Sequence, residues 1–234
     1  MTEPATGRSL PPLRNCLRRY GQIVIAIPLL AVLVIGALGA PVLFGHDPSR
    51  LNVRAKVEAP GFTHLLGTDE FGRDILSRLA HGARITLVVA AASVLLAALG
   101  GTLLGSVAAY AGRGVETVIM RTMDGMLCFP PILLGIFIVT FLGPSIVNLI
   151  LVIGVLYVPR FTRVVHSSTL AIRELEYVES ARALGASAAR IIARAILPNI
   201  LAPIFVQASL AAGHAILMES GLSFLGLGPP PPTP

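Results

Sequence analysis

The sequence predicts an all-α membrane protein that crosses the bilayer several times. Of its 234 residues, 54% are hydrophobic and only 13% are charged, and the mean hydropathy is +0.80. Soluble domains contain about 25% charged residues, so these values exclude an ordinary soluble domain. The hydrophobic residues gather into long runs, and a helix needs roughly 20 such residues to cross a membrane. Five spans are expected, at residues 23–44, 85–110, 126–141, 145–165 and 199–225.

The positive charges predict the orientation of the chain. The net charge of +6 does not indicate binding to nucleic acid, because the arginines flank apolar runs and only 6% of the residues are aromatic. Cytoplasmic segments of membrane proteins carry an excess of Lys and Arg. We expect residues 1–22 to form a cytoplasmic tail and residues 45–84 an external loop. The inner segments then hold Arg8, Arg14, Arg18, Arg19, Arg113, Arg121, Arg160, Arg163, Arg173, Arg182, Arg190 and Arg194. The outer segments hold only Arg50, Arg54, Lys56, Arg73, Arg78 and Arg84.

The external loop contains a compact polar stretch, residues 64–78, just before the second span. Thr68 or Asp69 is expected to cap the helix that follows, and Gly67 and Gly72 allow tight backbone turns. The favoured interpretation is a structural turn, and direct contact with a substrate is the alternative. No nucleophile or histidine pattern accompanies the carboxylates, so no catalytic residue is predicted.

The second span, residues 85–110, is rich in small side chains and contains a Gly-x-x-x-Gly pattern at Gly101 and Gly105. Small residues let helix backbones approach closely in lipid, where no hydrophobic force drives helices together. Two interpretations remain open: close packing against another helix of the same subunit, or a contact between two subunits.

The third span is expected to be broken near its start. Residues 111–124 are expected to form a short loop, and Pro130 and Pro131 follow soon after it. Prolines remove backbone donors, which is tolerated in membranes where the freed carbonyls meet protein or line a water-filled cavity. Pro130 and Pro131 are therefore candidate residues of a translocation pathway, with a kinked packing helix as the alternative.

The fifth span carries the other candidate pathway residues, Gln207, His214, Met218 and Glu219. An ionisable group at membrane depth is costly and usually faces protein or water. His214 and Met218 are four residues apart, so they are expected to share a helix face. They could present nitrogen and sulfur to a soft metal, but packing is the favoured interpretation, and no metal site is predicted.

Residues 166–198, between the fourth and fifth spans, predict two short helices joined by a turn. Gly185 is expected to end the first helix, because glycine readily adopts the left-handed conformation of a helix end. Ser187 is expected to cap the second helix, and Pro198 to end it. The first helix carries an apolar stripe formed by Tyr177, Val178, Ala181 and Leu184. An amphipathic helix–turn–helix between spans is suited to docking onto another protein; lying on the membrane surface is the alternative.

This segment resembles the EAA loop of the membrane subunits of bacterial ABC importers. The residues that carry the resemblance are Glu179, Ala181, Arg182, Gly185, Ala186, Ser187, Leu197 and Pro198. Ser180 stands where alanine is usual, and Ala195 where a larger aliphatic residue is common. The stretch Gly67–Asp74 and the run Gly221–Gly228 resemble the oligopeptide, dipeptide and nickel branch of that family. We call residues 166–198 the EAA-like segment.

The resemblance implies a type I ABC importer transmembrane domain, whose core here is residues 85–234. It implies a peptide permease subunit in the cytoplasmic membrane that forms half of the pathway. The expected partners are a second homologous permease, two ATPase subunits, an external substrate-binding protein and membrane lipid, with no nucleic acid. The EAA-like segment would dock onto an ATPase. ATP and Mg²⁺ would be used by the ATPase subunits, with no cofactor on this chain. A sixth span after the proline-rich end is expected from the family plan.

Three rival functions follow from the sequence. A nickel, haem or metal-complex importer would belong to the same family. A secondary transporter driven by an ion gradient would need ionisable residues deep in several spans or repeated broken helices. An enzyme is disfavoured, because the sequence holds no Gly-x-x-x-x-Gly-Lys-Ser/Thr phosphate loop and no nucleophile–base constellation.

Overall fold

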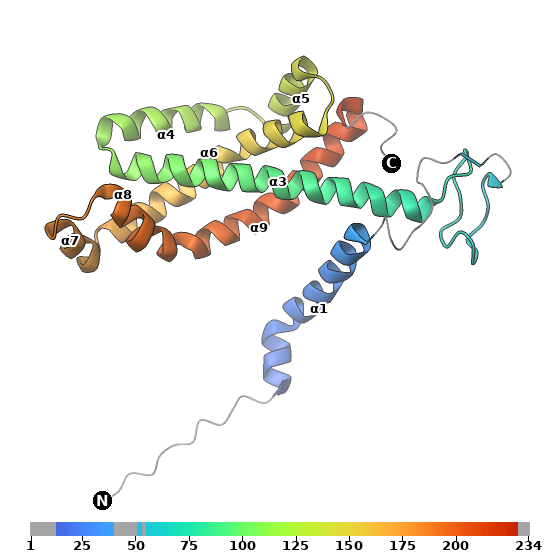
Figure 1. Ribbon diagram of the computed structural model, residues 1–234, viewed down its shortest axis with the longest axis horizontal. Coiled ribbons are helices and arrows are strands. Elements are labelled where there is room, and N and C mark those ends of the chain that lie inside the picture. Colours follow the sequence, from blue (N-terminus) through green and yellow to red (C-terminus); the bar gives the residue numbers. More distant parts are fainter. Residues whose placement is uncertain (1–12, 40–50, 53–54, 229–234) are drawn as a thin grey trace, which may run out of the picture. The chain divides into compact units, whose positions relative to one another are not determined.

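The computed structural model describes residues 13–39, 51–52 and 55–228 and is helical nearly throughout (Figure 1). Its chain divides into two compact units, Met1–Arg84 and Ile85–Pro234, which are described separately. In the described ranges, the only β pairing is an isolated bridge between Thr68 and Asp74. This agrees with the predicted all-α fold class.

The first unit contains helix α1, Leu13–Leu38, and an ordered loop that leads into helix α3. Helix α1 begins within the predicted tail, residues 1–22. Its apolar side chains between Ile25 and Ile35 are exposed, as expected for a helix that faces lipid. The predicted first span runs on to residue 44, and residues 40–44 lie outside the described part.

The loop before α3 is fixed by carboxylates and glycines, which fits the interpretation as a structural turn. Asp69 Oδ1 accepts hydrogen bonds from the backbone N–H groups of Phe71 and Arg73, both at 2.9 Å. Asp69 Oδ2 pairs with Arg78 Nη1 at 2.7 Å. Burial opposes ionisation of Asp69, but the two backbone hydrogen bonds and Arg78 outweigh it and lower the pKa of the carboxyl. Gly72 has a φ of +71°, and a Cβ there would lie 1.8 Å from Asn52 O, so only glycine fits.

The predicted helix cap in this loop was wrong. Helix α3, Ile75–Tyr110, begins after Asp74, whose Oδ1 accepts the Ser77 N–H at 2.7 Å. Asp69 is occupied as above, and Thr68 bonds instead to Ala55 O and Glu58 N. Asp74, which the sequence analysis did not consider, therefore caps the helix, because the Thr68 and Asp69 side chains stabilise the loop itself.

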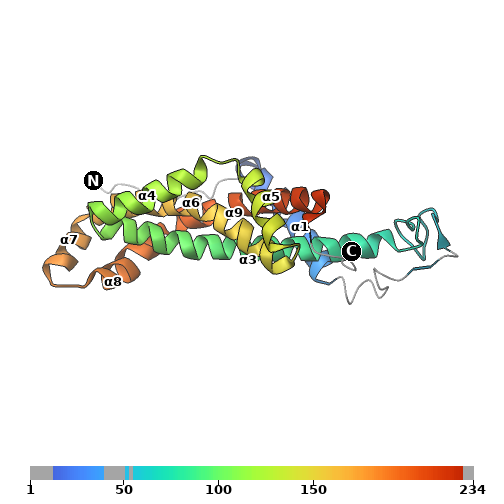
Figure 2. The same cartoon turned by 90° about the horizontal axis from the view of Figure 1, so that it is seen from above.

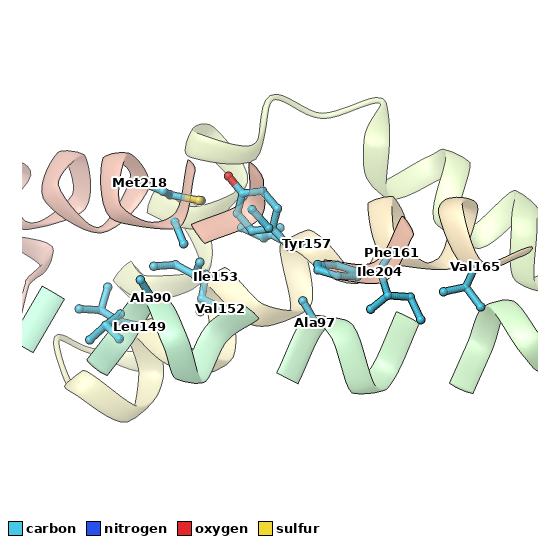
Figure 3. Close-up of a cluster of buried hydrophobic side chains, with 14 of the residues drawn as sticks. Ala90, Ala97, Leu149, Val152, Ile153, Tyr157, Phe161, Val165, Ile204 and Met218 are labelled. Carbon is cyan, nitrogen blue, oxygen red and sulfur yellow. The ribbon is translucent and has the colours of Figure 1, made fainter. Parts of the chain in front are cut away.

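The second unit contains the later part of α3, the short helices described below and four longer helices. These are α4, Arg113–Leu127; α5, Pro131–Leu142; α6, Ile146–Arg173; and α9, Leu197–Leu222, which continues into the π-helical turn η3, Ser223–Leu227. Helix α6 is the centre of the unit, and Leu149, Ile153 and Phe161 on it are fully buried (Figure 3). Among the described residues, three helices are long and apolar enough to cross a membrane, or four if α4 and α5 form one broken span.

The Gly-x-x-x-Gly pattern of α3 forms a contact within this subunit. A Cβ on Gly101 would lie 2.3 Å from Phe161 Cβ, and one on Gly105 would lie 2.7 Å from Thr162 O. Both partners belong to α6. Of the two interpretations that the sequence left open, the packing within one chain is therefore the observed one.

The predicted loop at residues 111–124 was wrong, because most of this segment is helix α4. Its polar side chains pair with α6: Glu116 Oε1 lies 3.0 Å from His166 Nε2, and Asp124 Oδ1 lies 2.5 Å from Arg163 Nη2. Figures 1 and 2 show α4 running alongside α6. The axis then bends by 90° between α4 and α5, at the expected Pro130 and Pro131. Pro131 occupies the first turn of α5, where the missing donor costs least.

Candidate functional site

The EAA-like segment contains the two predicted short helices. Helix α7 is Glu176–Ala183 and helix α8 is Ala188–Ile191. Gly185 ends α7, as predicted: its φ is +82°, its N–H bonds to Arg182 O, and the Ala186 N–H bonds to Ala181 O. These two bonds form a Schellman motif, which satisfies the last carbonyls of the helix. In Figure 1, α7 and α8 lie near the end of α3 that carries Tyr110.

The second half of the segment differs from the prediction in two ways. Ser187 is the N-cap residue of α8, but its side chain makes no capping hydrogen bond. Pro198 does not end the helix: α8 continues through the π-helical turn η2, Ile192–Ile196, into α9, with Leu197 and Pro198 in its first turn. The wider π turn accommodates the missing proline donor. Asn199 Nδ2 donates to Ala195 O at 2.7 Å, so its side chain bonds to the backbone one turn earlier.

The apolar stripe of α7 divides between the core and the surface. Val178 is fully buried, and Ala181 packs against the core. Leu184 is 88% exposed at the turn, and Tyr177 is also exposed. One side of α7 therefore anchors the segment, while the turn presents a large apolar side chain outward.

Two arginines connect the EAA-like segment to the ends of the spans. Arg173 Nη1 donates to Ala109 O at 2.6 Å, in the last turn of α3, where carbonyls lack helical donors. Arg182 donates to Tyr110 Oη at 3.3 Å, with its guanidinium 5.7 Å from the centre of the Tyr110 ring. The hydrogen bond to Tyr110 raises the pKa of Arg182, and Glu179 adds to the effect. Sequence reasoning did not connect Arg173 with Ala109 or Arg182 with Tyr110, because these partners lie 64 and 72 residues apart in the chain.

A cavity of about 620 Å³ separates α7 from the ends of α3 and α6. It is lined by Ala109, Tyr110, Arg173, Glu174, Glu179 and Arg182. Four of these residues are charged, and both guanidinium groups are engaged in the bonds described above. Polar contacts and the buried Val178 thus hold helix α7 to the spans, and the cavity between them is lined mainly by polar and charged side chains.

The candidate pathway residues do not gather at one place. Gln207 is half-buried, and His214 and Pro130 are exposed, whereas Met218 and Glu219 are buried inside the subunit. Met218 packs on α5, where a Cβ on Gly135 would lie 2.6 Å from Met218 Cε. His214 bonds through Nδ1 to Leu210 O at 2.8 Å. His214 and Met218 are four residues apart in α9, as expected for a shared face, but His214 is exposed whereas Met218 is buried.

Glu219 is held by two hydroxyl groups. Thr86 donates to its Oε2 at 3.0 Å, and Ser223 donates to its Oε1 at 2.8 Å. The Glu219 side chain thus connects α3, α9 and the π-helical turn η3. This arrangement satisfies a polar group that would otherwise be costly in the membrane.

The fold defines a multi-pass membrane protein with an exposed, ordered helix–turn–helix between two of its long helices. Residues 101–234 match the family described as "Binding-protein-dependent transport system inner membrane component". The chain belongs to this family, and its fold is that of a type I importer transmembrane domain.

Individual relatives cover nearly the whole chain. A protein of Brucella abortus biovar 1 is 42% identical over 216 residues, which are 92% of this chain and 73% of the relative. The "Dipeptide transport system permease protein DppC" of Alkalihalophilus pseudofirmus is 41% identical, over 93% of this chain and 72% of the relative. The "Di/tripeptide transport system permease protein DppC" of Pseudomonas aeruginosa is 39% identical, over 88% and 70%.

Proposed function

We propose that this chain is a permease subunit of an ATP-driven importer of short peptides. The family is that of importer membrane components, and two relatives at about 40% identity carry dipeptide or di/tripeptide transport in their names. The chain would form half of the pathway across the cytoplasmic membrane. Nothing in the arrangement of His214 and Met218 favours the nickel or haem alternative.

The observation that carries the coupling role is the ordered turn between α7 and α8. The Schellman motif at Gly185 fixes the turn, and Leu184 projects from it with 88% of its surface exposed. Leu184 would enter an apolar depression on an ATPase subunit, flanked by the exposed charges of Glu179 and Arg182. Movement of the docked turn would reach the spans through Arg182–Tyr110 and Arg173–Ala109.

The proposed assembly follows from this role. ATP and Mg²⁺ would bind to two ATPase subunits, and this chain would hydrolyse nothing itself. A second homologous permease would complete the pathway, and an external binding protein would deliver the peptide. The N-terminus and the EAA-like segment would lie in the cytoplasm, in keeping with the excess of arginine in those segments.

Replacing Gly185 with tryptophan tests the proposal in reconstituted importer. No atom lies within 4 Å of the position of a Gly185 Cβ, so the side chain itself fits, but its φ of +82° is strained for any other residue. The bulky ring would also obstruct the docking surface. We expect loss of peptide uptake with normal membrane abundance. Wild-type uptake by Gly185→Trp would refute the docking role.

A further inference from the structure

Arg160 is a cation at membrane depth that the sequence analysis counted among the cytoplasmic arginines. It lies in α6, fourteen residues after Ile146, so it is about 21 Å along the helix axis. A hydrocarbon core is about 30 Å thick, so a span that enters near Ile146 carries Arg160 past its middle but well short of the far edge. Lipid phosphates lie outside that core. A phosphate is therefore not the natural partner of this guanidinium.

The Arg160 side chain turns toward the middle of the span. Its guanidinium carbon lies 5.2 Å from the ring centre of Tyr157, one helical turn nearer to the start of α6. Side chains on a helix point toward its N-terminus, so the backbone itself favours this direction over the nearer membrane surface. Tyr157 is 5% exposed and belongs to the buried cluster in Figure 3. The ring therefore provides a rigid support for the cation.

Arg160 has no anionic partner within the described residues. The neighbouring Arg163 pairs with Asp124, whereas no hydrogen bond or ion pair joins Arg160 to any described group. The Tyr157 ring attracts the cation but carries no negative charge to balance it. Arg160 is half-buried, so part of its surface remains accessible. A guanidinium at this depth requires water or an anion beside it.

A second polar group lies on the same aromatic ring. His214 of α9 is exposed, and its ring centre lies 6.5 Å from that of Tyr157. Its Nδ1 must carry the hydrogen in the bond to Leu210 O, since a carbonyl oxygen only accepts. In the neutral ring, Nε2 is then an acceptor directed away from the helix backbone. Arg160 of α6 and His214 of α9 thus place a donor fork and an acceptor beside the same Tyr157 ring.

We propose that Arg160 is a substrate-contacting residue of the pathway, which binds the terminal carboxylate of a peptide in transit. This inference rests on the proposed function. The five donors of a guanidinium match the two oxygens of a carboxylate, which every unmodified peptide carries whatever its sequence. Tyr157 positions the guanidinium, and His214 Nε2 accepts an N–H of the same substrate. One cation can therefore serve many different peptides.

The test compares uptake of radiolabelled dialanine with uptake of dialanine amide by the complete importer in proteoliposomes. For each substrate, the uptake by a variant is divided by the uptake by the wild type. Any preference of the external binding protein for one substrate then cancels. We expect Arg160→Gln to lower dialanine uptake about tenfold or more relative to its effect on the amide, since a hydrogen bond between charged groups is lost. Arg160→Lys keeps a cation, so its dialanine uptake, relative to the amide, should fall less than that of Arg160→Gln. The matched control is Arg163→Gln, which should affect both substrates equally.

Three other outcomes would contradict the substrate contact, the role of Arg160 in transport or the peptide assignment. Equal loss for both substrates in Arg160→Gln, with Arg160→Lys active, would overturn substrate contact and indicate a partner acid on the second permease. Unchanged uptake of both would overturn any role in transport. If the wild type imports neither substrate while its ATPase responds to the binding protein, then the peptide assignment fails, and this proposal with it. The amount of assembled complex, measured for every variant, separates these results from misfolding.

Discussion

Gly101 of α3 lies against Phe161 of α6 so closely that a Cβ on the glycine would be 2.3 Å from the Phe161 Cβ. The same position would be 2.9 Å from the Thr162 backbone N, so a rotamer change cannot relieve the overlap. The contact connects the second span to the most buried helix of the unit.

We therefore expect Gly101→Ala to lower the thermal stability of the purified chain. Overpacking of a filled core costs about 1–3 kcal/mol, and here the backbone itself must move. Thermal unfolding in detergent measures the effect. The matched control is Gly114→Ala on α4, where no atom lies within 4 Å of the new Cβ. Equal melting temperatures for the two variants would contradict the packing.

The hydrogen bonds of Glu219 predict that replacing this residue lowers the stability of the folded chain. Glu219→Gln retains one acceptor oxygen but places an amide NH₂ where the second hydroxyl now donates. One buried polar group is then unpaired, at a cost of about 1–3 kcal/mol. Thr86→Val should cost a similar amount, because it leaves Oε2 of Glu219 without its donor.

A double-mutant cycle tests whether these two residues act as one unit. The effects of Thr86→Val and Glu219→Gln on unfolding should be clearly non-additive, since the residues share one hydrogen bond. Strict additivity would show that the bond contributes nothing. If Glu219→Gln abolishes uptake at unchanged stability, then Glu219 contacts substrate, and its structural role is wrong.

The Asp69 carboxylate predicts acid sensitivity of the external loop. Its pKa in the folded loop is lowered from the ordinary value of 3.8. A lowered folded pKa means that the stabilisation is fully present above the unfolded pKa and is lost as pH falls through the folded value. Exchange protection of the Phe71 and Arg73 amides should therefore persist at pH 5 and fall below pH 3.8.

The neutral variant Asp69→Asn provides the comparison. It should show weak protection of both amides at every pH, because the pairing with Arg78 is lost. A wild-type loop whose protection does not change between pH 5 and pH 3 would contradict the assignment to Asp69.

The sequence predicted the helical class, the turn at Gly185 and the break at Pro130 and Pro131. These features depend on local backbone chemistry: glycine permits positive φ, and proline removes a donor. Helix α4 was missed because a polar, charged segment resembles a loop when its partners are unknown. Glu116 and Asp124 are satisfied by His166 and Arg163, which lie 50 and 39 residues further along the chain.

The candidate site was predictable only in part, because some of its side chains also contact partners far away in the sequence. Motif spacing identified the EAA-like segment, but it gave no signal of the contacts that Arg173 and Arg182 make with Ala109 and Tyr110 at the end of α3. The expected end of the helix at Pro198 failed because a π turn precedes it, and that geometry leaves no periodic signal in the sequence. Arg160 could have been recognised in the sequence as a cation inside an apolar run. The charge count instead assigned it to the cytoplasmic side.

The central claim, that the turn at Leu184 docks onto an ATPase subunit, is tested most directly by purification. The chain is isolated from membranes that contain the complete importer, and the ratio of ATPase to permease is measured for the wild type, Leu184→Asp and Leu65→Asp. Leu65 is also exposed, at 60%, and lies on the loop expected outside the membrane. We predict a stoichiometric ATPase for the wild type and Leu65→Asp, and a loss of about tenfold or more for Leu184→Asp, since a buried carboxylate without a partner is strongly unfavourable. Full retention of the ATPase by Leu184→Asp would contradict the account.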